Sequence, residues 1–555
     1  MKKKLYLFTL LAISGQAVLA QNVTIPDANL KAKILSSSPA NTVAKNSAGN
    51  YFAVDANGDG EIQQTEAAQV KSLDVNNSAV ASMDGITDFV NLESLDCSYN
   101  AIDKLYLLNM SSIKWINASH NTLNNGGINV GPNIEYLDLN HVNFSQIALN
   151  LSNKNMLSYL NLQNSDIYEL DCSNSKLTTL ILNGCSNLHI LDCSNNLLTS
   201  LDLSGLNITG EAYYLGSGPN TLTHYKGGVD CSHNNLTNLN IANLTTNFLN
   251  CSYNNLTSLN AGTLTLVKMP NVPVSAIPEP SLYFDCSHNQ LNSLAVNGSF
   301  VIQYFDCSYN NLTMLNVPNI VTQFFNCNNN NLNSLNISDS SEINILNMSY
   351  NSMTSFVSPV LPEVSNPNAI MDYFNSNHSL NCSHNQLTFL NLNNTQIPSV
   401  NASDNNIHTL FVKNGIYNEF TDLQNNPDIQ SVCADDSAIN PGDPSYTEVN
   451  YFQDMLPLAN VGSNCSNAVL SVSEKTADRE KVTVYPNPAK DRVQINAGSE
   501  ISSVSMFDMQ GRLVKRHSGT GSASEEIMLD DVPAGNYIFK VITQKGSFTR
   551  KVIKK

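Results

Sequence analysis

The chain has 555 residues, too many for one compact core, so we expect several structural units. Its formal net charge is −18, and residues 21–480 hold 13 Lys and Arg against 39 Asp and Glu. A body this acidic repels phosphates, which excludes DNA and RNA as partners.

The first 20 residues have the features of a secretory signal peptide. Lys2, Lys3 and Lys4 precede a short apolar run, and Ala20 closes a stretch of small residues suited to cleavage. The apolar run is too short to anchor the chain in a bilayer, and no later stretch is long enough. We therefore predict export, a mature chain beginning near Gln21, and no transmembrane segment.

Residues 21–91 are predicted to form an N-terminal cap that contains a calcium loop. The twelve residues 55–66 read DANGDGEIQQTE, which is the complete pattern of an EF-hand loop. The oxygen ligands would be Asp55, Asn57, Asp59, Glu61 (through its carbonyl) and Glu66. A single hand suggests a structural Ca²⁺ that seats the cap; the alternative is an acidic, glycine-rich turn without metal.

Residues 92–432 repeat one unit, L-x-x-L-x-(C/L)-x-x-N-x-L, first seen in LESLDCSYNAI at 92–102. The sixth position recurs mostly every 20 or 21 residues, and this period indicates a solenoid. Leu162 and Leu203 fall about half a repeat out of step, so the register around 150–230 stays open.

Each unit contains a short strand, in which alternate residues face opposite sides. Positions four and six are apolar and should point inward, whereas positions three, five and seven should point outward. Stacked coils then share one core, which predicts an arc with a parallel sheet on its concave face. The ninth position is Asn in twelve coils, where its amide can bond the backbone as the strand turns away.

Nine of the twelve cysteines occupy the sixth position of the unit: Cys97, Cys172, Cys193, Cys231, Cys251, Cys286, Cys307, Cys327 and Cys382. We predict free, buried thiols there, because neighbouring parallel strands lie about 4.8 Å apart, farther than the Cβ separation of a disulfide. Cys433 and Cys465 lie past the last coil and are the disulfide candidate, closing a C-terminal cap at 433–466. The alternative is two unpaired thiols.

The repeat resembles the leucine-rich-repeat family, in particular its bacterial internalin-like type. The resemblance covers about 92–432 and departs from the pattern at Val142 and Ser175, where the Asn is absent. It implies that the concave face binds another protein or, in some members, a glycan.

Residues 481–555 differ in character from the repeats. They hold 12 Lys and Arg against seven Asp and Glu, and include VYPNP at 484–488, MQGRLV at 509–514 and PAGNY at 533–537. These motifs resemble the type A sorting domain of the type IX secretion system in Bacteroidota, a small β-sandwich, with 467–480 as linker. The resemblance implies contact with that machinery and a product that is secreted or held at the outer surface. The alternative is a β-sandwich of independent function.

Outward positions supply the candidate ligand-binding residues. Position five is almost always Asp or Asn, including Asp138, Asp285 and Asp306. Position three carries aromatics in two blocks: Trp115, Tyr136 and Tyr159, then Phe248, Tyr283, Tyr304 and Phe324. Such a surface suits a protein interface or a sugar-stacking platform. It is equally explained by cross-strand pairing and repeat consensus, without any ligand.

Three coils carry insertions, at about 205–228, 261–281 and 356–379, which we expect to rim the ligand site. A recurring set of His and Tyr at position eight is interpreted as edge packing rather than metal ligands. No catalytic motif is present, so we predict a binding or adhesion protein and not an enzyme. The alternatives are a structural surface protein and, least favoured, a solenoid carbohydrate-active enzyme.

Overall fold

The computed structural model describes residues 21–124, 127–145, 147–214, 223–267, 282–296, 300–361, 378–415, 420–436, 438–440, 443–457, 459–463, 482–508, 513–543 and 546–555. The chain divides into two compact units, with the boundary between residues 468 and 469. The predicted signal peptide (1–20) and linker (467–480) lie outside the described residues.

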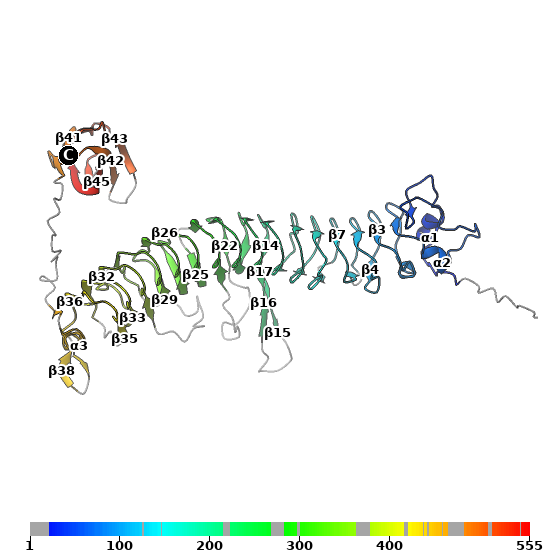
Figure 1. Ribbon diagram of the computed structural model, residues 1–555, viewed down its shortest axis with the longest axis horizontal. Helices are drawn as coiled ribbons and strands as arrows, with labels where there is room; N and C mark the ends of the chain where they lie inside the picture. The colour runs from blue at the N-terminus through cyan, green and yellow to red at the C-terminus, as the bar shows by residue number, and fades with distance from the viewer. Residues whose placement is uncertain are drawn as a thin grey trace, which may run out of the picture. The chain divides into compact units, whose positions relative to one another are not determined.

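The first unit is a β-solenoid with two long sheets (Figure 1). The seven-stranded sheet has the order β1 (Ala44–Lys45), β2 (Ser72–Asp74), β3 (Ser94–Asp96), β5 (Trp115–Asn117), β7 (Tyr136–Asp138), β9 (Tyr159–Asn161), β11 (Thr179–Ile181). The twelve-stranded sheet, in chain order, has β8 (Ala148–Asn150), β10 (Glu169–Asp171), β12 (Ile190–Asp192), β17 (Gly228–Asp230), β20 (Phe248–Asn250), β23 (Tyr283–Asp285), β25 (Phe300–Asp306), β27 (Ile320–Asn326), β29 (Glu342–Asn347), β31 (Ser379–Asn381), β33 (Ser399–Asn401) and β35 (Phe420–Asp422). All their pairings are parallel except β1 with β2.

Successive strands alternate between the two sheets. β9 pairs with β7 and β11, whereas β10 pairs with β8 and β12. Each of these windings therefore contributes one strand to each side of the solenoid. We call the side with the seven-stranded sheet face 1 and the side with the twelve-stranded sheet face 2.

Shorter sheets extend both faces. Face 1 continues through β13 (Ser200–Asp202) with β18 (Asn238–Asn240), β21 (Ser258–Ala261) with β24 (Ser293–Val296), β26 (Met314–Asn316) with β28 (Ser334–Asn336), and β30 (Ser355–Val357), β32 (Phe389–Asn391), β34 (Thr409–Phe411), β36 (Ser431–Cys433), β39 (Asn460–Gly462). Face 2 begins with β4 (Lys104–Leu107) and β6 (Gly127–Val130), and a third short sheet contains β14 (Asn207–Ile208), β19 (Thr245–Thr246) and β22 (Thr265–Leu266). Figure 1 shows β26 and β32 on the opposite side from β25, β29 and β33.

The repeat motif changes faces along the chain. Cys97 follows the face 1 strand β3, whereas Cys172 and every later slot cysteine up to Cys382 follow face 2 strands. Leu162 and Leu203, which seemed out of step, follow β9 and β13 on face 1. The predicted solenoid is confirmed, but the single concave sheet is wrong. Each winding has two strands, and a 20–21-residue period does not reveal which of them carries the motif.

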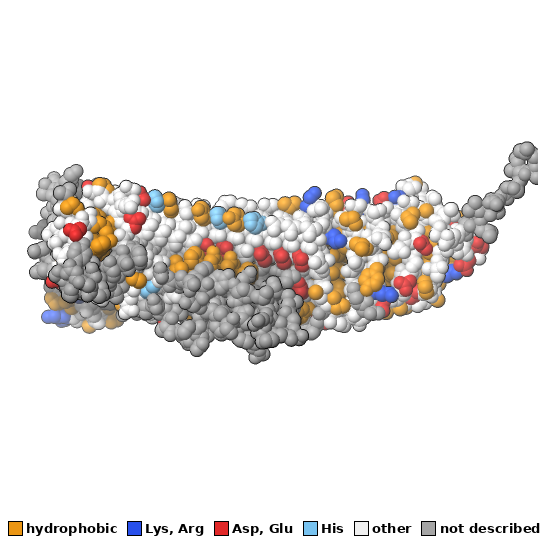
Figure 2. All heavy atoms as spheres, turned by 90° about the horizontal axis from the view of Figure 1, so that it is seen from below, with side chains coloured by type: hydrophobic (Ala, Val, Ile, Leu, Met, Phe, Trp, Pro, Cys, Tyr) orange, Lys and Arg blue, Asp and Glu red, His pale blue; other side chains and the backbone are white. Residues whose placement is uncertain are grey.

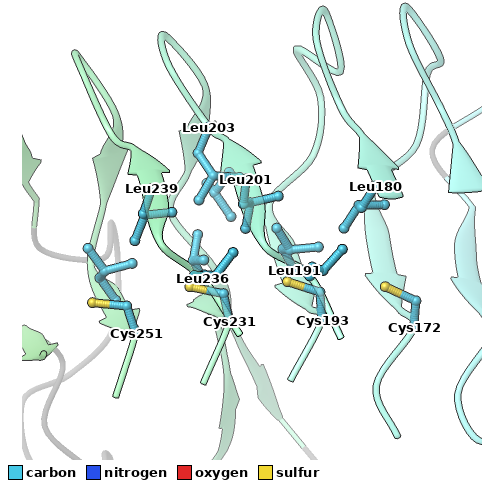
Figure 3. Packing of buried hydrophobic residues seen from close by; sticks show 14 of the residues in the cluster. Cys172, Leu180, Leu191, Cys193, Leu201, Leu203, Cys231, Leu236, Leu239 and Cys251 are labelled. Carbon is cyan, nitrogen blue, oxygen red and sulfur yellow. The ribbon is translucent and has the colours of Figure 1, made fainter. Parts of the chain in front are cut away.

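The core is continuous through the windings and contains the cysteines. In Figure 3, Cys172, Cys193, Cys231 and Cys251 lie in one row, with Leu191, Leu201 and Leu239 packed beside them. All nine slot cysteines are buried and free, as predicted. Burial raises the pKa of the Cys382 thiol to about 12, so it stays protonated and behaves as a small apolar side chain.

The Asn at position nine bonds each winding to the one before it. The Nδ2 of Asn234 donates to the carbonyl oxygens of Cys193 (3.0 Å) and Cys231 (3.2 Å), and its Oδ1 accepts from the N–H of Leu198 at 3.0 Å. The same bonds recur from Asn196 to Asn426 on face 2, and at Asn121 on face 1. We call this column the Asn ladder.

Shorter side chains replace the ladder where the motif changes faces. At the winding after Val142, Ser165 Oγ donates to the Leu139 carbonyl at 2.6 Å and accepts from the Val142 N–H at 3.1 Å. The Cys185 thiol donates to the Leu162 carbonyl at 3.0 Å, and Ser175 Oγ accepts from the Lys154 N–H at 3.1 Å. The missing amides are therefore partly compensated by hydroxyl and thiol groups.

The ends of the solenoid are covered by small caps. The N-terminal cap contains α1 (Ala28–Leu35), α2 (Gln64–Ala67) and the 3₁₀ helix η1 (Ile86–Asp88). Asp27 joins α1 to the first winding, since Oδ1 accepts from the N–H of Leu30 and Oδ2 from that of Ala81. The parallel sheet already starts at β2, one winding before residue 92.

The C-terminal cap contains α3 (Glu448–Met455) and the antiparallel pair β37 (Ala438–Asn440) and β38 (Asp443–Thr447). Cys433 is disulfide-bonded. Its predicted partner, Cys465, lies outside the described residues, so the pairing stays a prediction.

The second unit has two antiparallel sheets around one core. One sheet contains β40 (Thr483–Tyr485), β41 (Arg492–Asn496) and β44 (Ser524–Met528); the other has the order β43 (Leu513–Ser518), β42 (Ile501–Asp508), β45 (Gly535–Thr543), β46 (Gly546–Lys554). Val493 and Ile527 from the first sheet and Phe539 and Val541 from the second belong to the same buried cluster. Tyr537 donates its hydroxyl to the Pro533 carbonyl at 2.8 Å, which fixes the turn into β45.

The Asn ladder yields a stability prediction. N234A removes the partners of a buried N–H and two carbonyls, each costing roughly 1–3 kcal/mol when left unsatisfied. We expect a loss of at least about 3 kcal/mol, measured by urea denaturation. The adjacent N235A is the control, because Asn235 is exposed and should change stability by less than about 0.5 kcal/mol. Equal midpoints for the two variants would contradict the ladder's role.

Candidate functional site

The two aromatic blocks predicted at position three lie on different faces. Trp115, Tyr136 and Tyr159 begin β5, β7 and β9 on face 1, and we call them block 1. Block 2 lies on face 2 and consists of Phe248, Tyr283, Tyr304 and Phe324. The expectation that all seven rings share one concave sheet is therefore wrong, because the motif changes faces between the blocks.

Within each block the rings stack face to face. In block 2 the centroid distances are 4.5, 4.6 and 4.9 Å and the interplanar angles are 9°, 6° and 11°. In block 1 they are 5.1 and 4.3 Å, with angles of 12° and 5°. In-register strands about 4.8 Å apart impose this stacking. Ring faces inside a block are covered by neighbouring rings, so only the ring edges and hydroxyls are left uncovered by stacking.

The position-five residues have a structural task in every winding. Oδ1 of Asp285 and of Asp306 accepts from the N–H two residues later, that of Ser287 or Ser308, each at 2.8 Å. Oδ1 of Asp138 accepts from Asn140 N–H at 3.0 Å in the same way. This Asx-type turn explains why Asp and Asn alternate freely at this position.

The second carboxylate oxygen connects the acidic column to block 2. Tyr283 donates its hydroxyl to Asp285 Oδ2 at 3.0 Å, and Tyr304 donates to Asp306 Oδ2 at 3.1 Å. Asn326 Nδ2 also donates to Asp306 Oδ2, at 2.9 Å. Figure 2 shows carboxylates in a row beside a block of hydrophobic side chains on this side of the solenoid. The result is a cluster of hydroxyls and carboxylates fixed by mutual hydrogen bonds.

Burial raises the pKa of Asp285 to about 6, and the neighbouring charge of Asp306 acts in the same direction. Burial and the charge of Asp285 also raise the pKa of the Tyr283 hydroxyl. Burial likewise raises the pKa of Asp192, which lies between Asp171 and Asp230 on adjacent strands. Face 2 therefore carries stacked carboxylates, and ionisation is disfavoured at Asp192 and Asp285.

The position-eight residues form a separate column at the turn after the strand, with positive φ from Tyr99 to Asn425. His233, Tyr253, His288 and Tyr309 stack in that order, with centroids 4.1–4.4 Å apart. The predicted edge packing is confirmed. Within the described part of the chain, no group of three or more His, Cys, Asp or Glu is placed to hold a metal ion.

The loop at 55–66 offers the right donor atoms for calcium, but its carboxylates face its own backbone. Asp55 Oδ2 accepts from the N–H of Gly60 at 2.9 Å. Glu66 Oε1 and Oε2 accept from the N–H groups of Ala56 (2.9 Å) and Gln63 (3.0 Å), which places Glu66 in a capping box. The donor chemistry thus fits calcium, whereas the carboxylates do not converge as a ready ligand set; the ligands Asp55, Asn57, Asp59, Glu61 and Glu66 stay a prediction.

Each of the three insertions is described only in part. Residues 211–214 and 223–226 form the antiparallel hairpin β15 (Glu211–Tyr214) and β16 (Thr223–Lys226), which projects from the solenoid in Figure 1. Most of the insertions at 261–281 and 356–379 lies outside the described residues. Their expected place around a ligand site stays a prediction.

The sequence interpretation missed polar residues at the start of face 1. β2 adds Ser72 and Asp74 to the outward columns, one winding before the first repeat motif at residue 92. Lys71 Nζ pairs with Glu93 Oε1 at 2.7 Å, and Lys114 Nζ with Glu135 Oε1 at 3.9 Å. Alternating Lys and Glu at position two, about 21 residues apart, was the available signal.

Comparison with known families identifies the C-terminal unit. Residues 483–555 match the secretion system C-terminal sorting domain family. The predicted sorting domain is confirmed. A tail of this kind indicates an exported protein, secreted or held at the surface. In the described residues we find no helix with the length and apolar character needed to cross a membrane.

Solved structures similar to the chain are internalins of Listeria monocytogenes. The functional domain of InlJ, described as including a cysteine ladder, is 17% identical, covers 96% of this chain and 98% of its own, and has a TM-score of 0.22. InlF is 18% identical (59% of this chain, 95% of its own, TM-score 0.21). A search of curated proteins finds no match. The fold itself is established by the strand order and the repeat.

The raised pKa of Asp285 predicts a pH-dependent stability. A carboxyl whose pKa is higher in the folded than in the unfolded chain stabilises the fold below about pH 4, and this contribution is lost as the pH rises through about 6. D285N should therefore be more stable than the parent by about 2–3 kcal/mol at pH 8, and equally stable at pH 4. Asn occupies this position in neighbouring windings, so the turn is kept. Urea denaturation at both pH values measures the difference; the exposed D202N is the control and should show none.

Proposed function

We propose that this protein is an exported adhesion or recognition module that binds a protein partner through face 2, at block 2 and its carboxylates. The observation that carries the proposal is the cluster of half-buried rings and hydroxyls hydrogen-bonded to Asp285 and Asp306. Tyr side chains with an apolar body and a polar tip are typical centres of protein interfaces. The sorting domain supports exposure of this surface outside the cell.

The stacking geometry favours a protein over a glycan at block 2. A sugar stacks on an open aromatic face, but Tyr283 and Tyr304 have both faces covered by neighbouring rings. Ring edges and hydroxyls remain, and these suit side chains and backbone groups of a protein. The structural alternative also has support, because stacked rings and Asx turns stabilise the sheet without a ligand. An enzyme is supported least, since the carboxylates of face 2 serve the turns of successive windings.

A binding screen with matched variants tests the proposal. The exported chain is screened against arrays of surface proteins and polysaccharides, and any saturable ligand is then tested with Y304S. Ser occupies position three in many windings, so Y304S should fold, and we expect affinity to fall about 10- to 100-fold. Y159S on face 1 is the control and should bind normally. Equal binding by both variants contradicts the proposal, and substrate turnover would favour the enzyme alternative.

We also infer that residues 55–66 bind Ca²⁺ as a structural ion of the N-terminal cap. Support comes from the all-oxygen donor set, the positive φ of Gly60 (80°) and the buried Ile62 that fixes the loop to the cap. Glu61 pairs with Lys31 of α1 at 2.8 Å, so ordering the loop also orders the helix. Binding requires Glu66 to leave its capping box and turn toward the ion.

Calcium should raise the thermal midpoint of the exported chain relative to a chelator. At calcium 100 times above Kd the expected stabilisation of the cap is about 2.7 kcal/mol. E66Q should lose this response, because the twelfth position supplies the bidentate ligand. E61Q should keep it, since position seven acts through its carbonyl. Calorimetric titration that finds no calcium uptake would refute the inference.

A further inference from the structure

We propose that the open end of block 1, at Trp115, is a second binding site that receives an arginine side chain of a protein partner. This site lies on face 1 and does not depend on the function proposed for face 2. It would recognise a planar cation, stacked on the indole and held at its rim by carboxylates.

Trp115 is the first ring of its column. Tyr136 covers one side of the indole, at 5.1 Å between centroids. On the other side the register partner of Trp115 is Ser94, and the partner of Ser94 is Ser72. Two serines thus precede the indole where later windings place rings. Neither is large enough to cover it, so this ring face is left uncovered, unlike the inner faces of blocks 1 and 2.

The polar groups beside this face are mostly hydrogen-bond acceptors. Asp96 Oδ1 accepts from the N–H of Ser98 at 3.0 Å, and its Oδ2 accepts only a long bond from Asn117, 3.3 Å. Asp74 uses one oxygen for its turn, accepting from Asn76 N–H at 3.1 Å. A carboxylate has about four acceptor sites, so Asp74 and Asp96 can each accept further hydrogen bonds from a ligand that lies over Ser72 and Ser94.

An ion pair between Lys71 and Glu93 lies at the other end of β3 from Asp96. Glu93, just before β3, bonds Lys71 Nζ through Oε1 at 2.7 Å, and this hydrogen bond and the charges of Lys71 and Lys114 lower the pKa of Glu93. Lys114 also lies 3.9 Å from Glu135 Oε1, so each of the two lysines is paired with a carboxylate. A guest lying on β3 would meet Glu93 at one end of the strand and Asp96 at the other, with Ser94 below.

This combination fits a guanidinium better than a sugar. A guanidinium is planar, stacks on aromatic faces and has only donors, all in its own plane, where Glu93 and Asp96 lie. A sugar carries no positive charge for the carboxylates of Asp74 and Asp96 to attract. The acidic body, with 39 Asp and Glu against 13 Lys and Arg over residues 21–480, also favours a basic partner.

Trp115 itself reports on the site, because it is the only tryptophan of the chain. The exported chain is titrated with a short, end-blocked peptide containing one arginine, and tryptophan emission is followed. We expect a saturable change that weakens with salt, is several-fold weaker for the lysine peptide and is absent for the uncharged citrulline peptide. A saturable response to neutral saccharides with none to the arginine peptide would overturn the proposal.

Two variants locate the binding. S94Y extends the column by one ring, as Tyr136 and Tyr159 already do, and should abolish the response by covering Trp115. The matched control S258Y adds a ring at the same position of β21, where Ser258 is exposed, and should leave it unchanged. D96N should weaken binding about tenfold, whereas D202N should not. Full binding by S94Y, with circular dichroism showing a native fold, refutes the site independently of any result on face 2.

Discussion

The structure depends on one constraint, the exact superposition of equivalent residues in successive windings, and the Asn ladder enforces it. Each ladder amide bonds backbone groups of two windings, as Asn234 bonds Cys193 and Leu198 of the winding before it and Cys231 of its own. A slip of one residue would break these bonds and expose the core positions. Like residues therefore lie above like residues, and every position of the repeat becomes a column: thiols inside, carboxylates and rings outside.

Superposition of the windings has favourable and unfavourable effects. It favours stacking of the aromatic rings, since parallel strands bring them to stacking distance. For carboxylates the effect is unfavourable, because burial and the charge of Asp306 on the adjacent strand raise the pKa of Asp285. Asn at position five keeps the same turn without charge, and Asn250 separates Asp230 from Asp285. The polar column is therefore a compromise between turn geometry and electrostatic repulsion.

Much of this could be predicted from the sequence, because periodicity reports directly on stacking. The solenoid, the buried thiols and the outward columns followed from recurring residues, and the sorting domain followed from the resemblance of its motifs to a known family. The change of face did not, since Leu139 and Cys172 satisfy the same motif although they follow strands of different sheets. Ring faces and edges could not be distinguished either, because the sequence gives spacing without orientation. Ser72 and Asp74 were missed because Ser78 stands at position nine after β2, where the motif has Asn.

The row of free thiols affects how the protein resists oxidation after export. Export exposes the chain to oxidising surroundings, and the slot cysteines persist as thiols because the stacked windings exclude oxidants and keep them protonated. That protection lasts only while the windings stay closed. Adjacent thiols lie in the middle windings, from Cys172 to Cys327, so they become reactive together only if those windings open, and a disulfide formed between two of them would block reclosure. The outermost slot thiols, Cys97 and Cys382, lie next to Ala118 and Ala402, so fraying at an end exposes no thiol pair.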